Sequence, residues 1–296
     1  MGHQRKSGNS EGDDQKVEQL RGILSDCTLC PRQCRVNRLG GELGVCEVGA
    51  LAPVSSAGPH FGEERPLVGT GGSGTIFFAG CNLRCIFCQN YDISHGRAGR
   101  ETSTDDISLM MIRLQALGCH NINFVTPSHV SPMMAEAIVK ARRNGLTIPT
   151  VYNSGGYDLV ESLGLLEGLI DIYMPDFKFG GSGPSERYAN APDYPEVARA
   201  AIREMYRQVG DLEVTKGVAG RGLLVRHLVM PNDVAGSREI IDFLHDLSPD
   251  TYVNVMDQYR PMYKARSCPE IARYPTTEEF LRVYNYARDK GLRLAE

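Results

Sequence analysis

The sequence lacks a long apolar run, an apolar N-terminal stretch and a strong excess of charge of either sign. No segment approaches the roughly 18 apolar residues of a membrane span, and the polar, glycine-rich start of the chain does not resemble a secretory signal. The formal net charge of −4 over 296 residues gives no basis for binding nucleic acid or a membrane surface. We therefore expect a cytoplasmic globular protein that contacts neither, with residues 1–15 disordered.

The nine cysteines are unevenly spread along the chain. They form a group of four, a group of three and two single residues, Cys119 and Cys268. Without a secretion signal, closely spaced cysteines argue for metal binding rather than for disulfides. The total of nine cysteines fits one metal centre with four cysteine ligands, one with three, and two cysteines that bind no metal.

The group of three lies in a C-x3-C-x2-C segment, directly after an apolar and β-branched run at residues 75–78. The run predicts a buried strand, and the segment predicts a loop that presents three thiols. Three thiolates suit three irons of a [4Fe-4S] cluster and leave the fourth iron open for a cofactor or substrate. Zinc usually takes four ligands, and the nearest further candidate is His95. We expect Cys81, Cys85 and Cys88 to bind an iron–sulfur cluster.

This segment resembles the signature of the radical SAM superfamily, C-x3-C-x-φ-C with an aromatic residue at φ, where this chain has Phe87. The resemblance implies that the open iron chelates the amino and carboxylate groups of S-adenosylmethionine. It also implies that a flavodoxin- or ferredoxin-type protein reduces the cluster and that the cofactor is cleaved to a 5′-deoxyadenosyl radical. Phe87, beside the cluster, is then expected to cover the adenine.

The group of four lies in residues 16–70, which we expect to form a helix and a small metal-binding extension. It combines C-x2-C-P-x2-C with a later G-x-x-G-x-C, and the glycines allow the chain to turn back tightly. This pattern resembles the N-terminal extension in one branch of the pyruvate formate-lyase activating enzyme-like proteins. A structural zinc ion and a second, fully ligated [4Fe-4S] cluster both fit four thiolates. The expected ligands are Cys27, Cys30, Cys34 and Cys46.

In residues 71–296, short apolar runs alternate with helical patterns. Runs that are apolar on both faces favour a parallel sheet. We expect an α/β fold, an open six-stranded parallel (β/α)6 partial TIM-type barrel, which the resemblance also implies. Residues 180–184 suggest a mobile lid or a plain surface loop, and a capping box starts the last helix at Thr276. The strands are expected at residues 75–79, 121–126, 148–153, 170–175, 223–229 and 252–256.

Polar residues follow these strands, at the end where (β/α) barrels carry their chemistry. Asp176 and Lys178 resemble the D-x-K motif with which the activating enzymes contact S-adenosylmethionine, and such a pair complements its amine and carboxylate. His227 lies in a segment that resembles the fifth strand of those enzymes, near the methionine carboxylate and ribose. Asn153 and Ser154 are expected to face the same pocket and to bind the amine or the ribose hydroxyls.

The second strand departs from the activating enzymes. They carry Gly-Gly-Glu-Pro there, and its backbone carbonyls hold the amino group of the cofactor, whereas this chain has Val125-Thr126-Pro127. Backbone contacts survive a change of side chain, so Thr126 remains a candidate for cofactor binding. The departure weakens the inference about the substrate.

The leading hypothesis is a radical SAM oxidoreductase that abstracts hydrogen. By resemblance its substrate is a glycine in a glycyl radical enzyme, and another protein or a small molecule is the alternative. The rival hypothesis is a non-catalytic zinc or iron–sulfur protein that binds a partner or carries electrons.

Overall fold

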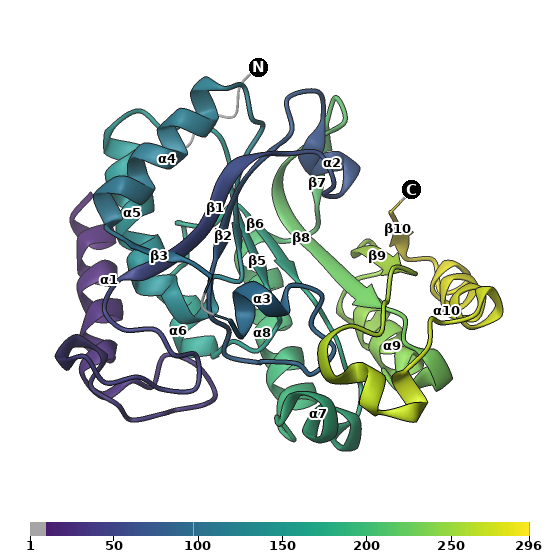
Figure 1. The fold of residues 1–296 in the computed structure, drawn as a ribbon. Helices are drawn as coiled ribbons and strands as arrows, with labels where there is room; N and C mark the ends of the chain where they lie inside the picture. Colours follow the sequence, from purple (N-terminus) through teal and green to yellow (C-terminus); the bar gives the residue numbers. More distant parts are fainter. Residues whose placement is uncertain (1–9, 97, 296) are drawn as a thin grey trace.

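The computed structural model describes residues 10–96 and 98–295. A curved sheet runs through the centre of the molecule (Figure 1). Each strand predicted from the sequence is present, and these strands are parallel neighbours in chain order, which confirms an α/β fold with a mostly parallel sheet. They are β2 (Ser73–Phe78), β4 (Ile122–Val125), β5 (Thr150–Ser154), β6 (Ile172–Pro175), β8 (Val218–Leu228) and β9 (Tyr252–Met256).

Within residues 10–96 and 98–295 the sheet has ten strands, so the structure does not confirm the expected count of six. Two antiparallel strands extend the edge beside β2, a third pairs with β8, and a short parallel strand follows β9. Three of these strands have only two or three residues, which is too short for an alternating pattern, and the other is rich in small residues. The added strands are β1 (Ala52–His60), β3 (Arg100–Thr102), β7 (Glu213–Thr215) and β10 (Arg293–Leu294).

Helices connect successive parallel strands. Figure 1 shows α1, α4 and α5 gathered at one end of the sheet, with α9 and α10 at the other end near the C-terminus. Within the described part of the chain, no helix is both long and apolar enough to cross a membrane. The helices are α1 (Ser10–Gly22), α2 (Arg65–Val68), α3 (Tyr91–Ser94), α4 (Thr104–Ala116), α5 (Ser131–Arg143), α6 (Val160–Gly164), α7 (Ser182–Ala189), α8 (Tyr194–Val209), α9 (Ser237–Leu247) and α10 (Thr277–Asp289).

Two expectations about chain organisation need correction, and a third can be placed in the fold. The expected disorder of residues 1–15 ends too late, because α1 already begins at Ser10; residues 1–9 lie outside the described residues. Residues 180–184, expected as a mobile lid or a plain surface loop, run into α7, where Pro184 lies in the first helical turn and its missing N–H is tolerated. The range 16–70 does not form a separate extension, because β1 pairs with β2 in the main sheet.

The strands divide the buried side chains between two cores. Successive residues of a strand point to opposite faces, so Tyr173 joins the larger core while its neighbours Ile172 and Met174 join a smaller one. Val151 of β5 and Leu224 of β8 belong to the same smaller core. The inner face of the curved sheet is therefore apolar along these strands, and the residues that follow on this face are available for a polar site.

The expected capping box at the start of α10 is confirmed. Thr276 Oγ1 accepts a hydrogen bond from the Glu279 N–H at 3.1 Å, and Glu279 Oε2 accepts one from the Thr276 N–H at 2.7 Å. The same carboxylate accepts hydrogen bonds from the N–H of Asn232 at 2.7 Å and from Arg273 at 2.8 Å. Glu279 thus joins α10 to the loop that follows β8.

We expect Glu279→Gln to lower the free energy of unfolding by about 1–2 kcal/mol, because it removes a charged acceptor from four hydrogen-bonding groups. Glu278→Gln is the matched control, since that side chain is 85% exposed and pairs with Arg282 at 3.3 Å on the helix surface. It should cost less than about 0.5 kcal/mol. Denaturant-induced unfolding of both variants measures the difference, and equal losses would contradict the role of Glu279.

Candidate active site

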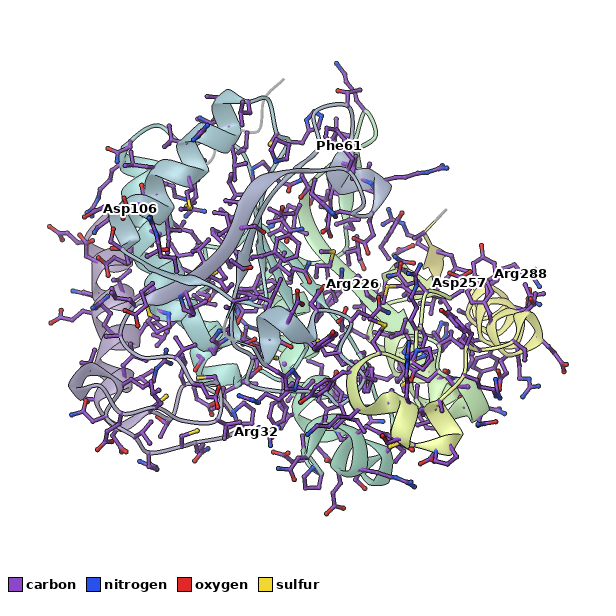
Figure 2. All side chains as sticks on the ribbon, viewed as in Figure 1. Arg32, Phe61, Asp106, Arg226, Asp257 and Arg288 are labelled. Atoms are coloured by element: carbon purple, nitrogen blue, oxygen red, sulfur yellow. The ribbon has the colours of Figure 1, made fainter. Side chains whose placement is uncertain are left out.

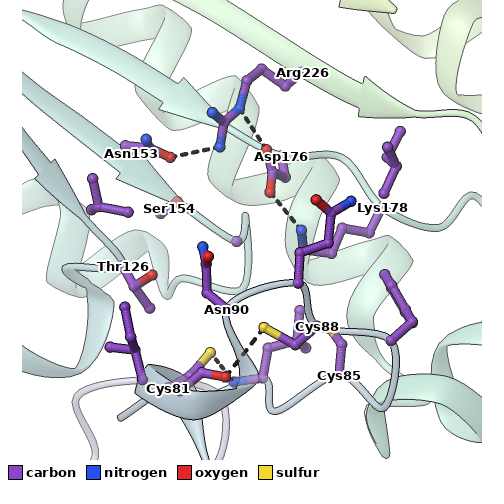
Figure 3. Close-up of a pocket in the computed structure, with 18 of the residues that line it drawn as sticks. Cys81, Cys85, Cys88, Asn90, Thr126, Asn153, Ser154, Asp176, Lys178 and Arg226 are labelled. Carbon is purple, nitrogen blue, oxygen red and sulfur yellow. Dashed lines mark hydrogen bonds and ion pairs between the residues drawn. The ribbon is translucent and has the colours of Figure 1, made fainter. Parts of the chain in front are cut away.

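A cavity of about 250 Å3 opens at the carboxyl ends of the parallel strands (Figure 3). It brings together all three cysteines of the central group and all but one of the residues expected to bind the cofactor. The expected residues that line it are Cys81, Cys85, Cys88, Phe87, Thr126, Asn153, Ser154, Asp176 and Lys178.

The three cysteines are free thiols on the loop after β2. Cys81 Sγ accepts a hydrogen bond from the N–H of Leu83 at 3.4 Å, and Cys88 Sγ accepts one from Ser94 Oγ at 3.2 Å. Burial raises the pKa of the Cys85 and Cys88 thiols. Thiols in such surroundings stay protonated on their own, so a bound metal is needed to favour the thiolates.

The spacing of the side chains fits a cluster better than a single ion. Among the described residues, no three Cys, His, Asp or Glu side chains lie close enough together to bind one metal ion. A [4Fe-4S] cluster takes one thiolate at each of its irons and therefore holds its sulfurs farther apart than zinc does. His95 is engaged elsewhere, since its Nδ1 lies 2.8 Å from Ser94 Oγ and its ring contacts Tyr263.

A network of charged side chains forms the opposite wall of the cavity (Figure 3). Asp176 accepts hydrogen bonds from Lys178 Nζ at 2.5 Å and from Arg226 Nε at 2.7 Å, and Arg226 Nη2 donates to Asn153 Oδ1 at 2.7 Å. Burial opposes the ionisation of Asp176, but attraction by Arg226 and Lys178 outweighs it and holds the pKa of this carboxyl below its usual range. The cavity thus presents a fixed carboxylate between two cations.

His227 does not line the cavity, contrary to the expectation from sequence. It is fully buried, and its two ring nitrogens lie 2.8 Å from the carbonyl oxygen of Phe177 and 2.8 Å from Ser237 Oγ. Its neighbour Arg226 lines the cavity instead. Adjacent strand residues face opposite sides of a sheet, and Leu224, two residues before Arg226, already lies on the inner face. That alternation was the signal that could have identified Arg226.

Tyr194, at the start of α8, holds two of the strand ends in place. Its buried hydroxyl lies 3.0 Å from the carbonyl oxygen of Gly155, 2.9 Å from that of Asp176 and 2.8 Å from the N–H of Lys178. These contacts join the loop after β5 to the loop after β6. The residue acts by positioning and does not line the cavity itself.

Thr126 has a backbone conformation that β-branched residues rarely adopt. Its φ is 60°, in the left-handed region. Its N–H donates to the carbonyl oxygen of Asn153 at 2.9 Å, so the strand pairing continues to this point and the chain then turns sharply. Strain of this kind often accompanies functional sites. Here the turn leaves Thr126 at the cavity while the residues after it run away from the cavity.

Three comparisons with known proteins bear on this site. Residues 75–180 match the model of the radical SAM superfamily. The chain is 35% identical over 290 residues to the uncharacterized protein MJ0674 of Methanocaldococcus jannaschii, covering 96% of this chain and 78% of that protein. It is 28% identical over 306 residues to the uncharacterized protein MJ0808 of the same organism, covering 95% and 80%.

The fold is also similar to that of a radical SAM methyltransferase from Sphaerobacter thermophilus. The TM-score is 0.50 at 14% identity, over 75% of this chain and 65% of the other, slightly less than two thirds of its length. This likeness concerns the fold alone. The narrower resemblance to the pyruvate formate-lyase activating enzymes stays a prediction.

The range matched by the family model contains the cysteine loop, Asn153, Asp176 and Lys178. The superfamily implies a [4Fe-4S] cluster and S-adenosylmethionine, and the spacing and chemistry of the cavity fit both. The chain therefore belongs to the radical SAM superfamily.

Proposed function

We propose that the protein is a radical SAM oxidoreductase that takes a hydrogen atom from its substrate at the mouth of the 250 Å3 cavity. The supporting observation is that the three cysteines and the network of Asp176, Lys178 and Arg226 face one another across this cavity (Figure 3). Three thiolates leave one iron of a cluster open. The charged wall opposite complements a cofactor that carries both an amine and a carboxylate.

When bound, the cluster and S-adenosylmethionine supply a 5′-deoxyadenosyl radical, with one electron from a flavodoxin- or ferredoxin-type protein. Asp176 accepts hydrogen bonds from the amine of the cofactor, and Lys178 attracts its carboxylate. Arg226 keeps Asp176 ionised and oriented. Asn153 and Ser154 offer groups that hydrogen-bond to the amine or the ribose hydroxyls.

The remaining walls exclude water from the reacting atoms. Phe87 is 4% exposed and stands among Phe179 and Tyr259, with ring centroids 5.8 Å and 6.1 Å away. It presents an apolar surface beside the cysteines, suited to the adenine. The other apolar residues of the lining include Phe77, Phe78, Val125, Leu228 and Met256.

The size of the cavity favours a large substrate over a small one. Ligand sites commonly have volumes of about 300–1,000 Å3, so 250 Å3 is filled by the cofactor with little space to spare. A substrate then has to reach the radical from the mouth, as an extended segment of a protein can. Together with the resemblance of Asp176 and Lys178 to the D-x-K motif, this supports the glycine of a glycyl radical enzyme as the site of hydrogen abstraction.

Anaerobically reconstituted and reduced protein should convert S-adenosylmethionine to 5′-deoxyadenosine, because the three-cysteine loop leaves an iron open for the cofactor. Cys85→Ala should abolish the product. Cys119→Ala is the matched control, since Cys119 is equally buried but does not line the cavity. Mass spectrometry of the nucleoside products shows which reaction takes place. S-adenosylhomocysteine in place of 5′-deoxyadenosine would indicate methyl transfer, and no turnover in fully iron-loaded protein would contradict the proposal.

Arg226→Lys should weaken the binding of S-adenosylmethionine by about 3–30-fold, because a lysine keeps the charge but cannot hold Asp176 and Asn153 at once. His227→Asn is the matched control, since this neighbour points away from the cavity. Equilibrium dialysis on folded, iron-loaded variants gives both affinities. A larger loss for His227→Asn than for Arg226→Lys would restore the assignment made from sequence.

A glycyl radical enzyme from the same host should acquire a glycine-centred radical when mixed with the reduced protein and S-adenosylmethionine. Electron paramagnetic resonance (EPR) detects this radical, and replacing the acceptor glycine by alanine should remove it. Production of 5′-deoxyadenosine without any such protein radical would leave the radical SAM activity intact and would direct the search to another protein or a small molecule.

A further inference from the structure

We propose that Cys27, Cys30, Cys34 and Cys46 bind a second [4Fe-4S] cluster, which lies against the cysteine loop of the active site and passes electrons to it. The second cluster is argued from its own residues. Only the transfer of electrons to the first centre rests on the proposed function.

The four cysteines line one small cavity that also includes His129 and Asn82. Its volume of about 10 Å3 is close to what one water-sized sphere occupies. A tetrahedral zinc ion, with Zn–S bonds of about 2.3 Å, leaves no such space between its sulfurs. Nor do any three metal-binding side chains of the described residues come close enough together for a single ion. A cavity that all four cysteines line, and that admits a water-sized sphere, suits a cluster better than a single ion.

The backbone is shaped around these sulfurs. Cys27 and the segment 35–36 exchange hydrogen bonds, Cys27 N–H to Val36 O and Arg35 N–H to Cys27 O, both at 3.0 Å. A Cβ on Gly44 would lie 2.7 Å from Cys34 Sγ, so only glycine fits there. The next N–H, that of Val45, lies 3.4 Å from the same sulfur and donates to it. Such contacts stabilise a thiolate more than a thiol.

A buried arginine beside the cysteines needs a negative partner. Arg38 is 1% exposed and donates to the carbonyl oxygens of Gly49 at 2.9 Å and of His129 at 2.9 Å. Its Nη1 lies 4.0 Å from Cys27 Sγ. In the described part of the chain no carboxylate forms an ion pair with it. An unpaired buried charge is costly, and metal-bound thiolates supply the missing negative charge.

His129 is a further buried polar residue of this cavity. It is 1% exposed, lines the same cavity and has Nε2 2.8 Å from the carbonyl oxygen of Ala79. Its Nδ1 is buried and has no hydrogen-bond partner. Because a carbonyl oxygen only accepts, Nε2 is the donor there and Nδ1 of a neutral ring carries a lone pair. Buried polar atoms are seldom left unpartnered.

The N-terminal cysteines lie against the loop that carries the active-site cysteines. Asn82 directly follows Cys81 and lines the same small cavity as Cys30. Arg32 Nε donates to the carbonyl oxygen of Asn82 at 2.8 Å, and Figure 2 shows Arg32 where the N-terminal segment meets the rest of the molecule. In the opposite direction, the active-site loop contacts the N-terminal segment: Arg84 Nη1 donates to the carbonyl oxygen of Val45 at 3.1 Å.

This proximity suits electron transfer. A low-potential one-electron donor of the flavodoxin or ferredoxin class would reduce the second cluster, which is reoxidised as the active-site cluster accepts the electron. One electron enters and one leaves, and no bond is made or broken at the second centre. The four thiolates complete the ligation of its irons, so it binds no substrate.

Metal analysis tests the second cluster without any need for activity. A variant with Cys81→Ala, Cys85→Ala and Cys88→Ala, reconstituted anaerobically, should keep about four irons per chain and an EPR signal that S-adenosylmethionine does not change. Cys34→Ser with Cys46→Ser should lose those irons and keep the signal that responds to the cofactor. About one zinc per chain in the first variant, or no bound metal, would overturn the proposal.

Measurements on the wild-type protein do not depend on whether the variants fold. They also test whether the two clusters lie close together. The wild-type protein should contain about eight irons per chain, and Cys119→Ala should contain the same number. In the fully reduced wild-type protein, magnetic coupling between the two clusters should broaden the EPR spectrum beyond the sum of the two variant spectra. A wild-type spectrum equal to that sum would overturn the contact between the centres, whether or not S-adenosylmethionine is cleaved.

Discussion

The active site depends on the alternation of side chains along the parallel strands. On the inner face, Val151 in β5 is followed by Asn153, and Leu224 in β8 is followed by Arg226. Each strand thus begins in an apolar core and ends in the charged network. A shift of one residue in β8 would exchange Arg226 with His227 and place a guanidinium in the larger core, at a high cost in free energy. The fold and the cavity are therefore fixed by the same pattern.

The buried charges of the cavity are paired, so that each group lowers the free-energy cost of burying its neighbour. Asp176 stays ionised because of two neighbouring cations, and Arg226 has two more carboxylates nearby, Glu63 Oε2 at 3.9 Å and Glu64 Oε1 at 4.0 Å. Buried charges that are paired in this way keep fixed positions. Because these groups are already oriented, binding of the cofactor loses little entropy in ordering them, which is the advantage of a preorganised site.

Local patterns in the sequence were sufficient for part of this structure. The cysteines, Asp176 and Lys178 were predicted because their spacing is a property of neighbouring residues, and the parallel strands because their apolar runs are distinct. Arg226 was missed, since its role depends on which face of β8 it occupies and on contacts with two other strands. The choice between zinc and a cluster at the N-terminal cysteines was also beyond the sequence, because it depends on distances between sulfurs that are brought together only by folding.

The loop at residues 82–84, held by Arg32 and contacted by the N-terminal segment through Arg84, has a consequence for how the protein matures. With the second cluster proposed above, ordering this loop around one metal centre would also order the walls of the other, so the conformational entropy lost at the first would not be lost again at the second. Loading of the two sites would then be cooperative, and partly loaded chains would be scarce. By the same linkage, oxidative loss of one centre would loosen the other.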